Sequence, residues 1–446
     1  MTGWVGRPAT DIAAAVGSGE VTAAQVVADH LDRIARLNAE LGAFVRVRAA
    51  EAADEAAAVD ARAGRADLPL AGVPVAVKDT VPVAGEPMRL GSAAIPDTTQ
   101  GEDHPVVERL RAAGAVIVGL TNLPELAIYP LTDSVFGITR NPWDRRRTAG
   151  GSSGGAAAAV ASAMVPLAHG TDGLGSVRIP AAACGLFGFK PGAGVVPARV
   201  GADSWHGLTE NGVLATTVAD AALMLGVLAG TSFELARAPR MRIAVSIRPP
   251  GPGVFVHRSC QAAVRQSAEL LTGMGHEVSE DDPDYPKWLT PALIAYWFAC
   301  PAGDAGSYAT GMEPRTRRHV RAGRAVLRVR PPDPSDRQRL RTALEPLFER
   351  HDVLMMPVLA RPCPPARRWG ERSWLRSVAL SLTFAPMTGT WNLAGFPAAA
   401  VPVPRAGLPG AVQLVAAPGR EHLLLSIAAQ IESARGWSRH APGYVT

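Results

Sequence analysis

A glycine-rich stretch in the middle of the chain restricts the possible folds more than any other feature. Residues 148–180 read TAGGSSGGAAAAVASAMVPLAHGTDGLGSVRIP and hold seven glycines and four serines. Two glycine clusters enclose an alanine-rich run, which predicts a turn, a packed helix and a second turn. A flexible linker would not contain such a helix. We therefore expect two ordered turns that present hydroxyl groups.

Short apolar strands alternate with helical segments on both sides of this stretch. The pieces LAGVPVAVKDT and HPVVERLRAAGAVIVGLTN predict strands at 72–77 and 115–118, with a helix between them. Further along, RMRIAVSIR predicts a strand, TVADAALMLGVLAG predicts a helix, and CQAAVRQSAELLTGMGHEVSE predicts a helix followed by a strand. This alternation predicts an α/β fold with a large mixed, mostly buried β-sheet flanked by helices on both faces.

The chain is expected to fold as one domain with an added N-terminal part. Residues 1–65 predict a helical segment that packs on the core, because apolar residues recur at helical spacing and Thr22 is a candidate N-cap. Residues 66–446 predict the main domain. Within it, residues 283–374 carry four tryptophans and many prolines, which indicates an irregular segment lying over the functional site.

Composition narrows the class of protein. The 446 residues include 45 Lys+Arg and 40 Asp+Glu, and only 5% are aromatic, so a nucleic-acid partner is not expected. The basic run at 313–330 is either a solvated helix face or a collar that attracts an anionic substrate. The start of the chain lacks a signal-peptide pattern, and no apolar stretch reaches about 18 residues without a charge or a proline. We therefore expect a cytoplasmic protein with no membrane contact, and four widely spaced cysteines that are buried thiols.

The serines of the glycine-rich stretch suggest nucleophilic chemistry. Ser152 and Ser153 precede the alanine-rich helix, where hydroxyl and backbone N–H groups converge. Ser176 lies on the second glycine turn, where successive N–H groups can converge on one oxygen, as an oxyanion hole requires. The motifs GxxxxGK[ST] and GxGxxG do not occur in this stretch, and GxSxG is absent around Ser176.

A serine nucleophile needs a base, and none of the 10 histidines lies in a triad-like motif. His169, the histidine nearest to Ser176 in this stretch, is better interpreted as a core residue. Lys78 ends the apolar run VPVAV, where burial would lower the pKa of its amine and make it a usable base. A strand-end lysine paired with Asp79 is the structural alternative.

At this point the chain resembles the amidase signature enzymes over most of its length. The resemblance rests on the set, order and spacing of seven pieces: GVPVAVKDT, GLTNLPELA, NPWDRRRTAGGSSGG, GTDGLGSVRIPAAACGLFGFKP, TVADAALMLGVLAG, MTGTWNLAGFPAAAVPVP and GAVQLVAAPGREHLLLSIAAQIE. It implies a single amidase-signature domain whose catalytic part is 66–446. It also implies hydrolysis of an amide through a serine acyl-enzyme, with no metal and no organic cofactor.

The resemblance also assigns residues. The family's Ser–cisSer–Lys triad maps onto Ser176 as nucleophile, Ser152 as the bridging serine after a cis peptide bond, and Lys78 as base. The remaining assignments fall into three groups. The oxyanion hole maps onto the backbone of Gly173, Leu174, Gly175 and Ser176. The supporting polar residues are Ser153, Asp172 and Arg178. The substrate pocket is expected to include Leu126 and Trp391.

Two positions depart from the family pattern. Leu120 replaces the lysine of Gly-Lys-Thr-Asn, and Leu174 replaces the glycine or alanine of the oxyanion turn, where it could block a positive φ or narrow the acyl pocket. The tryptophans at 297, 369, 374 and 391 suggest a small to medium, partly apolar amide, or else core packing.

Three functions follow from these residues. The first is a stand-alone amidase, for which a homodimer is one possible assembly. The second is the glutaminase subunit of a tRNA-dependent amidotransferase. The third is a catalytically weakened, amidase-like binding protein, which only Leu174 favours.

Overall fold

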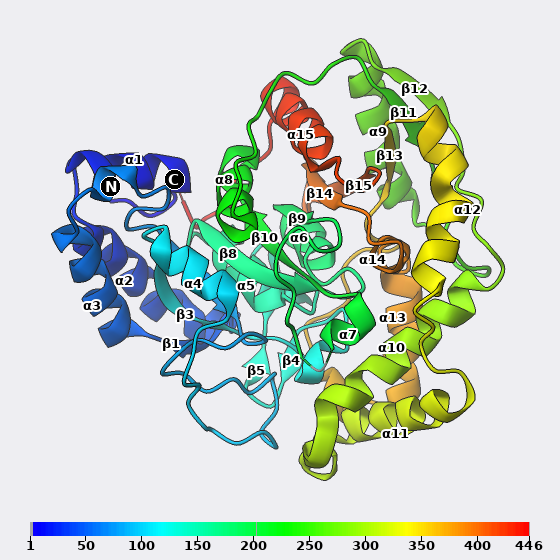
Figure 1. The fold of residues 1–446 in the computed structure, drawn as a ribbon, viewed down its shortest axis with the longest axis horizontal. Coiled ribbons are helices and arrows are strands. Elements are labelled where there is room, and N and C mark those ends of the chain that lie inside the picture. The colour runs from blue at the N-terminus through cyan, green and yellow to red at the C-terminus, as the bar shows by residue number, and fades with distance from the viewer. Residues whose placement is uncertain (1–2, 202, 446) are drawn as a thin grey trace.

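The computed structural model of the chain describes residues 3–201 and 203–445, and over these residues eleven strands form one mixed sheet. The sheet runs from the N-terminal helices at one end of the molecule to β12 at the other (Figure 1). Its strands, in spatial order, are β1 (Phe44–Val47), β3 (Val116–Thr121), β2 (Pro74–Lys78), β8 (Leu167–Asp172), β10 (Glu210–Ala215), β9 (Phe187–Lys190), β14 (Ala398–Val403), β15 (Gly410–Val415), β13 (Val353–Pro357), β11 (Arg242–Val245) and β12 (Glu277–Glu280).

Parallel and antiparallel pairs are both present, which confirms the expected mixed sheet. β2 pairs in parallel with β3 and β8, and β11 pairs in parallel with β12 and β13, whereas the central pairs from β8 to β15 are antiparallel. Two short ribbons lie outside the sheet: β4 (Asp133–Ser134) with β5 (Gly137–Ile138), and β6 (Arg140–Asn141) with β7 (Asp144–Thr148).

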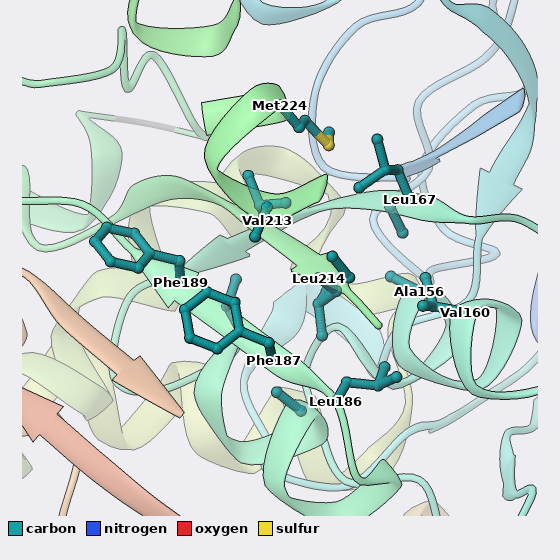
Figure 2. Packing of buried hydrophobic residues seen from close by; sticks show 14 of the residues in the cluster. Ala156, Val160, Leu167, Leu186, Phe187, Phe189, Val213, Leu214 and Met224 are labelled. Atoms are coloured by element: carbon teal, nitrogen blue, oxygen red, sulfur yellow. The ribbon is translucent and has the colours of Figure 1, made fainter. Parts of the chain in front are cut away.

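Helices cover both faces of the sheet. They are α1 (Ala9–Ser18), α2 (Ala23–Leu41), α3 (Ala49–Ala61), α4 (Pro105–Ala112), α5 (Gly154–Ala161), α6 (Arg178–Cys184), α7 (Ser204–Gly207), α8 (Val218–Ala229), α9 (Arg258–Gly273), α10 (Leu289–Ala305), α11 (Pro314–Val329), α12 (Asp336–Arg350), α13 (Trp374–Phe384), α14 (Gly389–Leu393) and α15 (Glu421–Arg435). Successive side chains of a strand point to opposite faces. In β10, Val213 points toward Met224 of α8, and Leu214 toward Ala156 of α5 (Figure 2).

The N-terminal part is helical as expected, with one exception. Thr22 caps α2 through a reciprocal capping box with Gln25, which confirms the predicted N-cap. Residues 44–47 are not helical but form β1, an edge strand that pairs antiparallel with β3. The chain can turn there because Gly42 adopts a left-handed conformation that ends α2. The two ends of the described chain lie close together (Figure 1), since a Cβ at Gly6 would lie 2.9 Å from Val445 Cγ1.

The segment 283–374 corrects a second expectation, because it is mostly helical rather than irregular. It contains α10, α11, α12 and β13. The many prolines suggested irregular structure, but they are compatible with these helices. Pro314 occupies the first turn of α11, where the backbone N–H that proline lacks would have no partner within the helix. Proline also lies within α10 and α12, at Pro301 and Pro346. Most arginines of α11 are exposed, but Arg315 is fully buried and pairs with Asp133.

Two observations concern cysteines and membranes. Cys184, Cys300 and Cys363 are buried free thiols, whereas Cys260 is partly exposed, so the expectation of four buried thiols holds for three. Over the described ranges, no helix has both the length and the apolar character needed to span a bilayer.

Candidate active site

The candidate site forms at one edge of the sheet, where neighbouring strands end. Lys78 is the last residue of β2 and Asp172 the last of β8, and these two strands pair in parallel. Their carboxyl ends therefore meet at the same edge, which is the usual ligand position in open α/β sheets. Ser152 lies between β7 and α5, and Ser176 between β8 and α6.

Lys78 is fully buried, and its amine points at the turn that carries Ser152 and Ser153, which we call the first serine turn. Its Nζ lies 2.8 Å from Ser152 Oγ, 2.8 Å from Thr171 Oγ1 and 3.3 Å from the Thr171 carbonyl oxygen. Burial lowers the pKa of Lys78 to about 7, although the charge of nearby Asp172 opposes this shift. A substantial fraction of the amine is therefore neutral near pH 7, as a general base requires.

The first serine turn is fixed by close backbone contacts. The Gly151–Ser152 peptide bond is cis. A Cβ at Gly151 would lie 2.6 Å from the backbone nitrogen of Leu131, so only glycine fits there. The Ser153 N–H donates to the Ser176 carbonyl oxygen at 3.1 Å and its Oγ to a β8 carbonyl at 3.3 Å, which connects the two serine turns.

A buried ion pair braces the second turn. Asp172 and Arg178 are both fully buried, with Nη2 to Oδ1 at 2.8 Å and Nε to Oδ2 at 2.9 Å. Burial alone would raise the pKa of Asp172, but Arg178 outweighs it and holds that pKa below its ordinary value. The Arg178 guanidinium also donates to acceptors from the last quarter of the chain: Thr388 O, Gln413 Oε1 and Asn392 Oδ1.

The turn between Asp172 and Ser176 accommodates a leucine without backbone strain. Gly175 has a φ of 119°, and a Cβ there would lie 2.1 Å from Thr388 Oγ1. Leu174 does not have a positive φ, so the backbone strain that its replacement of a glycine suggested is absent. One expectation needs correction: the Gly175 N–H donates to Asp172 Oδ1 at 2.6 Å, which makes it part of the brace rather than a free oxyanion donor.

Ser176 opens onto an apolar cavity of about 270 Å³. We call it the apolar cavity. Leu174, Trp205 and Trp297 contribute to its wall together with residues of α10 and α13. No charged side chain belongs to the wall formed by the described residues. Such a lining suits an uncharged, hydrophobic group.

A second, much smaller cavity of about 20 Å³ also borders Ser176. We call it the small cavity. Ser152 and Thr171 line this cavity but not the apolar one, whereas Ser176 lines both. Its wall also includes Thr80, Leu90, Leu126, Val200, Trp205 and Asp304.

The structure separates the two expected pocket residues. Leu126 is buried and lines the small cavity. Trp391 is fully buried against Phe348 and Phe396 and does not line either cavity, so its assignment to the pocket is corrected to core packing. A buried aromatic residue gives the same sequence signal in a core and in a pocket wall, which explains the error.

Trp205 is a site residue that sequence reasoning missed. It lines both cavities, whereas Trp297 lines only the apolar one and neither Trp369 nor Trp374 lines either. Trp205 sits on a short turn with positive φ values, 59° at Asp203 and 55° at Trp205 itself. Left-handed turns leave no periodic pattern in a sequence, so only the nearby glycines could have signalled it.

Comparison with known proteins agrees with this architecture. The family model described as Amidase matches residues 25–425. A Mycobacterium tuberculosis (strain ATCC 25618 / H37Rv) protein named "Putative amidase AmiB2" is 41% identical over 448 residues, covering 96% of each chain. The structure of 6-aminohexanoate cyclic dimer hydrolase complexed with substrate gives a TM-score of 0.84 at 28% identity, covering 99% of each chain. A bacterial aryl acylamidase of the amidase signature family gives 0.82 at 27% identity, covering 97% of each. The chain therefore belongs to the amidase signature family, and it is an amidase, a hydrolase that acts on carbon–nitrogen bonds.

Proposed function

We propose that this amidase cleaves small to medium, partly apolar amides through a serine acyl-enzyme formed on Ser176, with Ser152 and Lys78 as proton relay. The observation that carries the proposal is the 2.8 Å approach of the buried Lys78 amine to Ser152 Oγ, beside a serine that opens onto the apolar cavity. A nucleophile, a relay and a base of suitable pKa are the parts that this chemistry needs.

The base step follows from the contacts of Lys78. A neutral amine has two N–H groups and one lone pair. The two oxygens of Thr171, Oγ1 at 2.8 Å and the carbonyl at 3.3 Å, can accept both N–H groups. The lone pair is then available to the Ser152 hydroxyl, which in turn accepts the proton of Ser176.

Acyl transfer then proceeds in two halves. Ser176 Oγ attacks the amide carbonyl carbon, and backbone N–H groups of Gly173, Leu174 and Ser176 stabilise the oxyanion. The C–N bond breaks as Ser152 returns the proton to the leaving nitrogen. Water then attacks the ester, the C–O bond to Ser176 breaks, and the carboxylic acid leaves.

Two observations bear on the alternative functions. Free glutamine carries an ammonium and a carboxylate, which the apolar cavity is poorly suited to hold because its described wall has no charged side chain. A non-enzymatic binding protein was favoured by Leu174, whose φ is not positive. A stand-alone amidase therefore has the better support.

The test is turnover and active-site labelling. Purified protein is incubated with acetamide, hexanamide, 4-phenylbutanamide and glutamine, and the released ammonia is measured. We expect the two larger apolar amides to be cleaved with the highest kcat/KM. A serine-directed phosphonate should label the protein, and Ser176→Ala should abolish both labelling and turnover.

Ser162→Ala is the matched control, because Ser162 belongs to the same stretch but its hydroxyl donates to a carbonyl of α5. Labelling of Ser176→Ala at the wild-type level would exclude Ser176 as the nucleophile. Preference for glutamine over the apolar amides would favour the glutaminase function.

A further inference from the structure

The two cavities at Ser176 differ greatly in size, and we propose that this difference makes the enzyme selective for primary carboxamides, whose leaving group is ammonia. The inference rests on the proposed function and adds to it how the substrate is oriented between the two cavities. The acyl group occupies the apolar cavity, and the leaving nitrogen occupies the small cavity.

The orientation follows from the position of Ser152. In acyl transfer, the group that takes the proton from the nucleophile delivers it to the leaving nitrogen, so the nitrogen must lie within hydrogen-bond reach of that group. Ser152 and its neighbour Thr171 line the small cavity and not the apolar one, whereas Ser176 lines both. A substrate in the reverse orientation would place its nitrogen away from Ser152.

The size of the small cavity then limits the leaving group. Its volume of about 20 Å³ holds roughly one molecule the size of water, which is also the size of ammonia. An aryl or branched alkyl substituent on the nitrogen would need the wall to move. The apolar cavity, at about 270 Å³, has room for the larger acyl part.

The wall of the small cavity is held in place by several contacts. The Trp205 indole N–H donates to Asp304 Oδ2 at 2.7 Å. The edge of the same ring packs on Gly173, where an added Cβ would lie 3.0 Å from Cε3. Trp205 is 7% exposed, and Val200 of the same wall is 6% exposed. These contacts keep the bulk of the indole close to Ser176 and oppose widening.

The same cavity serves both halves of the reaction. When the C–N bond breaks, ammonia leaves with the proton from Ser152. One water molecule then occupies the vacated space, gives a proton to the Ser152–Lys78 relay, and attacks the ester carbon. The relay returns that proton to Ser176 Oγ as the acyl C–O bond breaks, and the carboxylic acid product leaves through the apolar cavity. No further reactant is required.

A matched substrate series tests the selectivity directly. Hexanamide, N-methylhexanamide and hexananilide share one acyl group and differ only at the nitrogen. We expect kcat/KM for hexanamide to exceed that for hexananilide at least about 100-fold, with the N-methyl amide between them. Values for the anilide within threefold of hexanamide would overturn this inference and leave the proposed function intact. Failure on all three, together with absent phosphonate labelling, would overturn both.

Variants of the wall test the cause. Trp205→Ala should raise the anilide-to-hexanamide ratio of kcat/KM at least about tenfold, because it enlarges the small cavity. Trp297→Ala is the matched control, since Trp297 lines only the apolar cavity and should leave that ratio within threefold. Val200→Ala is a smaller change at the same wall and serves if Trp205→Ala does not fold. A ratio that stays constant in the folded wall variants would refute the assignment of this wall.

Discussion

The pH dependence of amide turnover should follow the protonation of Lys78. Its amine must be neutral to accept a proton, and burial lowers its pKa from an ordinary 10.5 to about 7. Activity should therefore be lost as the pH falls through 7 and should reach a plateau above about pH 8. The substrates are uncharged amides, so their own ionisation does not contribute to the profile.

The size of the pH effect on kcat/KM follows from the fraction of Lys78 amine that is neutral. With a pKa of about 7, this fraction is about 9% at pH 6 and about 99% at pH 9, so kcat/KM should rise about tenfold over this interval and level off. A lysine with its ordinary pKa would be neutral in only about 3% of molecules at pH 9. Its activity would rise about tenfold per pH unit without a plateau.

The assay is ammonia release from hexanamide between pH 5.5 and 9.5, with circular dichroism at each pH to verify folding. Asp79 is the necessary control, because burial also raises the pKa of this neighbouring carboxyl to about 7. Asp79→Asn should keep the rise through pH 7, and residual activity of Lys78→Ala should lack it. Loss of the rise in Asp79→Asn, or activity still increasing tenfold per pH unit at pH 9, would refute the assignment.

Three further predictions concern stability and specificity. Lys78→Met should be inactive, yet it should have a higher melting temperature than wild type at pH 7. Between pH 7 and 10.5 the lysine is protonated in the unfolded chain but loses its proton in the folded site, so its burial destabilises the fold and its replacement by methionine removes this cost. An unchanged or lower melting temperature would contradict this. Gly175→Ala should lose at least about 1–3 kcal/mol in urea unfolding and most of its turnover, since the new Cβ meets Thr388; wild-type values would show that the turn relaxes easily. Leu174→Gly should improve kcat/KM for bulky acyl groups only, as a series of acyl lengths would reveal. An equal gain on every amide would mean that the leucine distorts the turn.

The sequence was sufficient to place the parts of the fold that repeat a pattern. The strands that end at Lys78 and Thr121 and the helix after Ser153 follow from apolar or alanine-rich runs and glycine stops. The four-residue strand β1 was missed because it carries Arg46 and lies between two helices. The segment 283–374 was misread because proline at a helix start is indistinguishable in the sequence from proline in a loop.

The candidate site was also predicted only in part from the sequence. The glycine turns indicated Ser152, Ser153 and Ser176, and the resemblance to the amidase signature enzymes selected Ser152 and Ser176, which both line the small cavity. The hydrogen bond from the Gly175 N–H to Asp172 depends on the exact course of one turn, which residue types do not encode. Trp205 and Trp391 are both buried aromatics, and only their tertiary neighbours distinguish a cavity wall from a core.

The brace around Arg178 has a consequence for when the enzyme becomes active during synthesis. The guanidinium reaches Gln413, 235 residues further along the chain, and Asn392, 214 residues further. At roughly 5–20 residues per second, the ribosome makes those residues about 10–50 s after Arg178. A nascent or C-terminally truncated chain holds the lysine, both serines and the Asp172 partner of Arg178, but it lacks the acceptors at Asn392 and Gln413 that complete the brace. We therefore expect hydrolysis to begin only when translation is nearly complete.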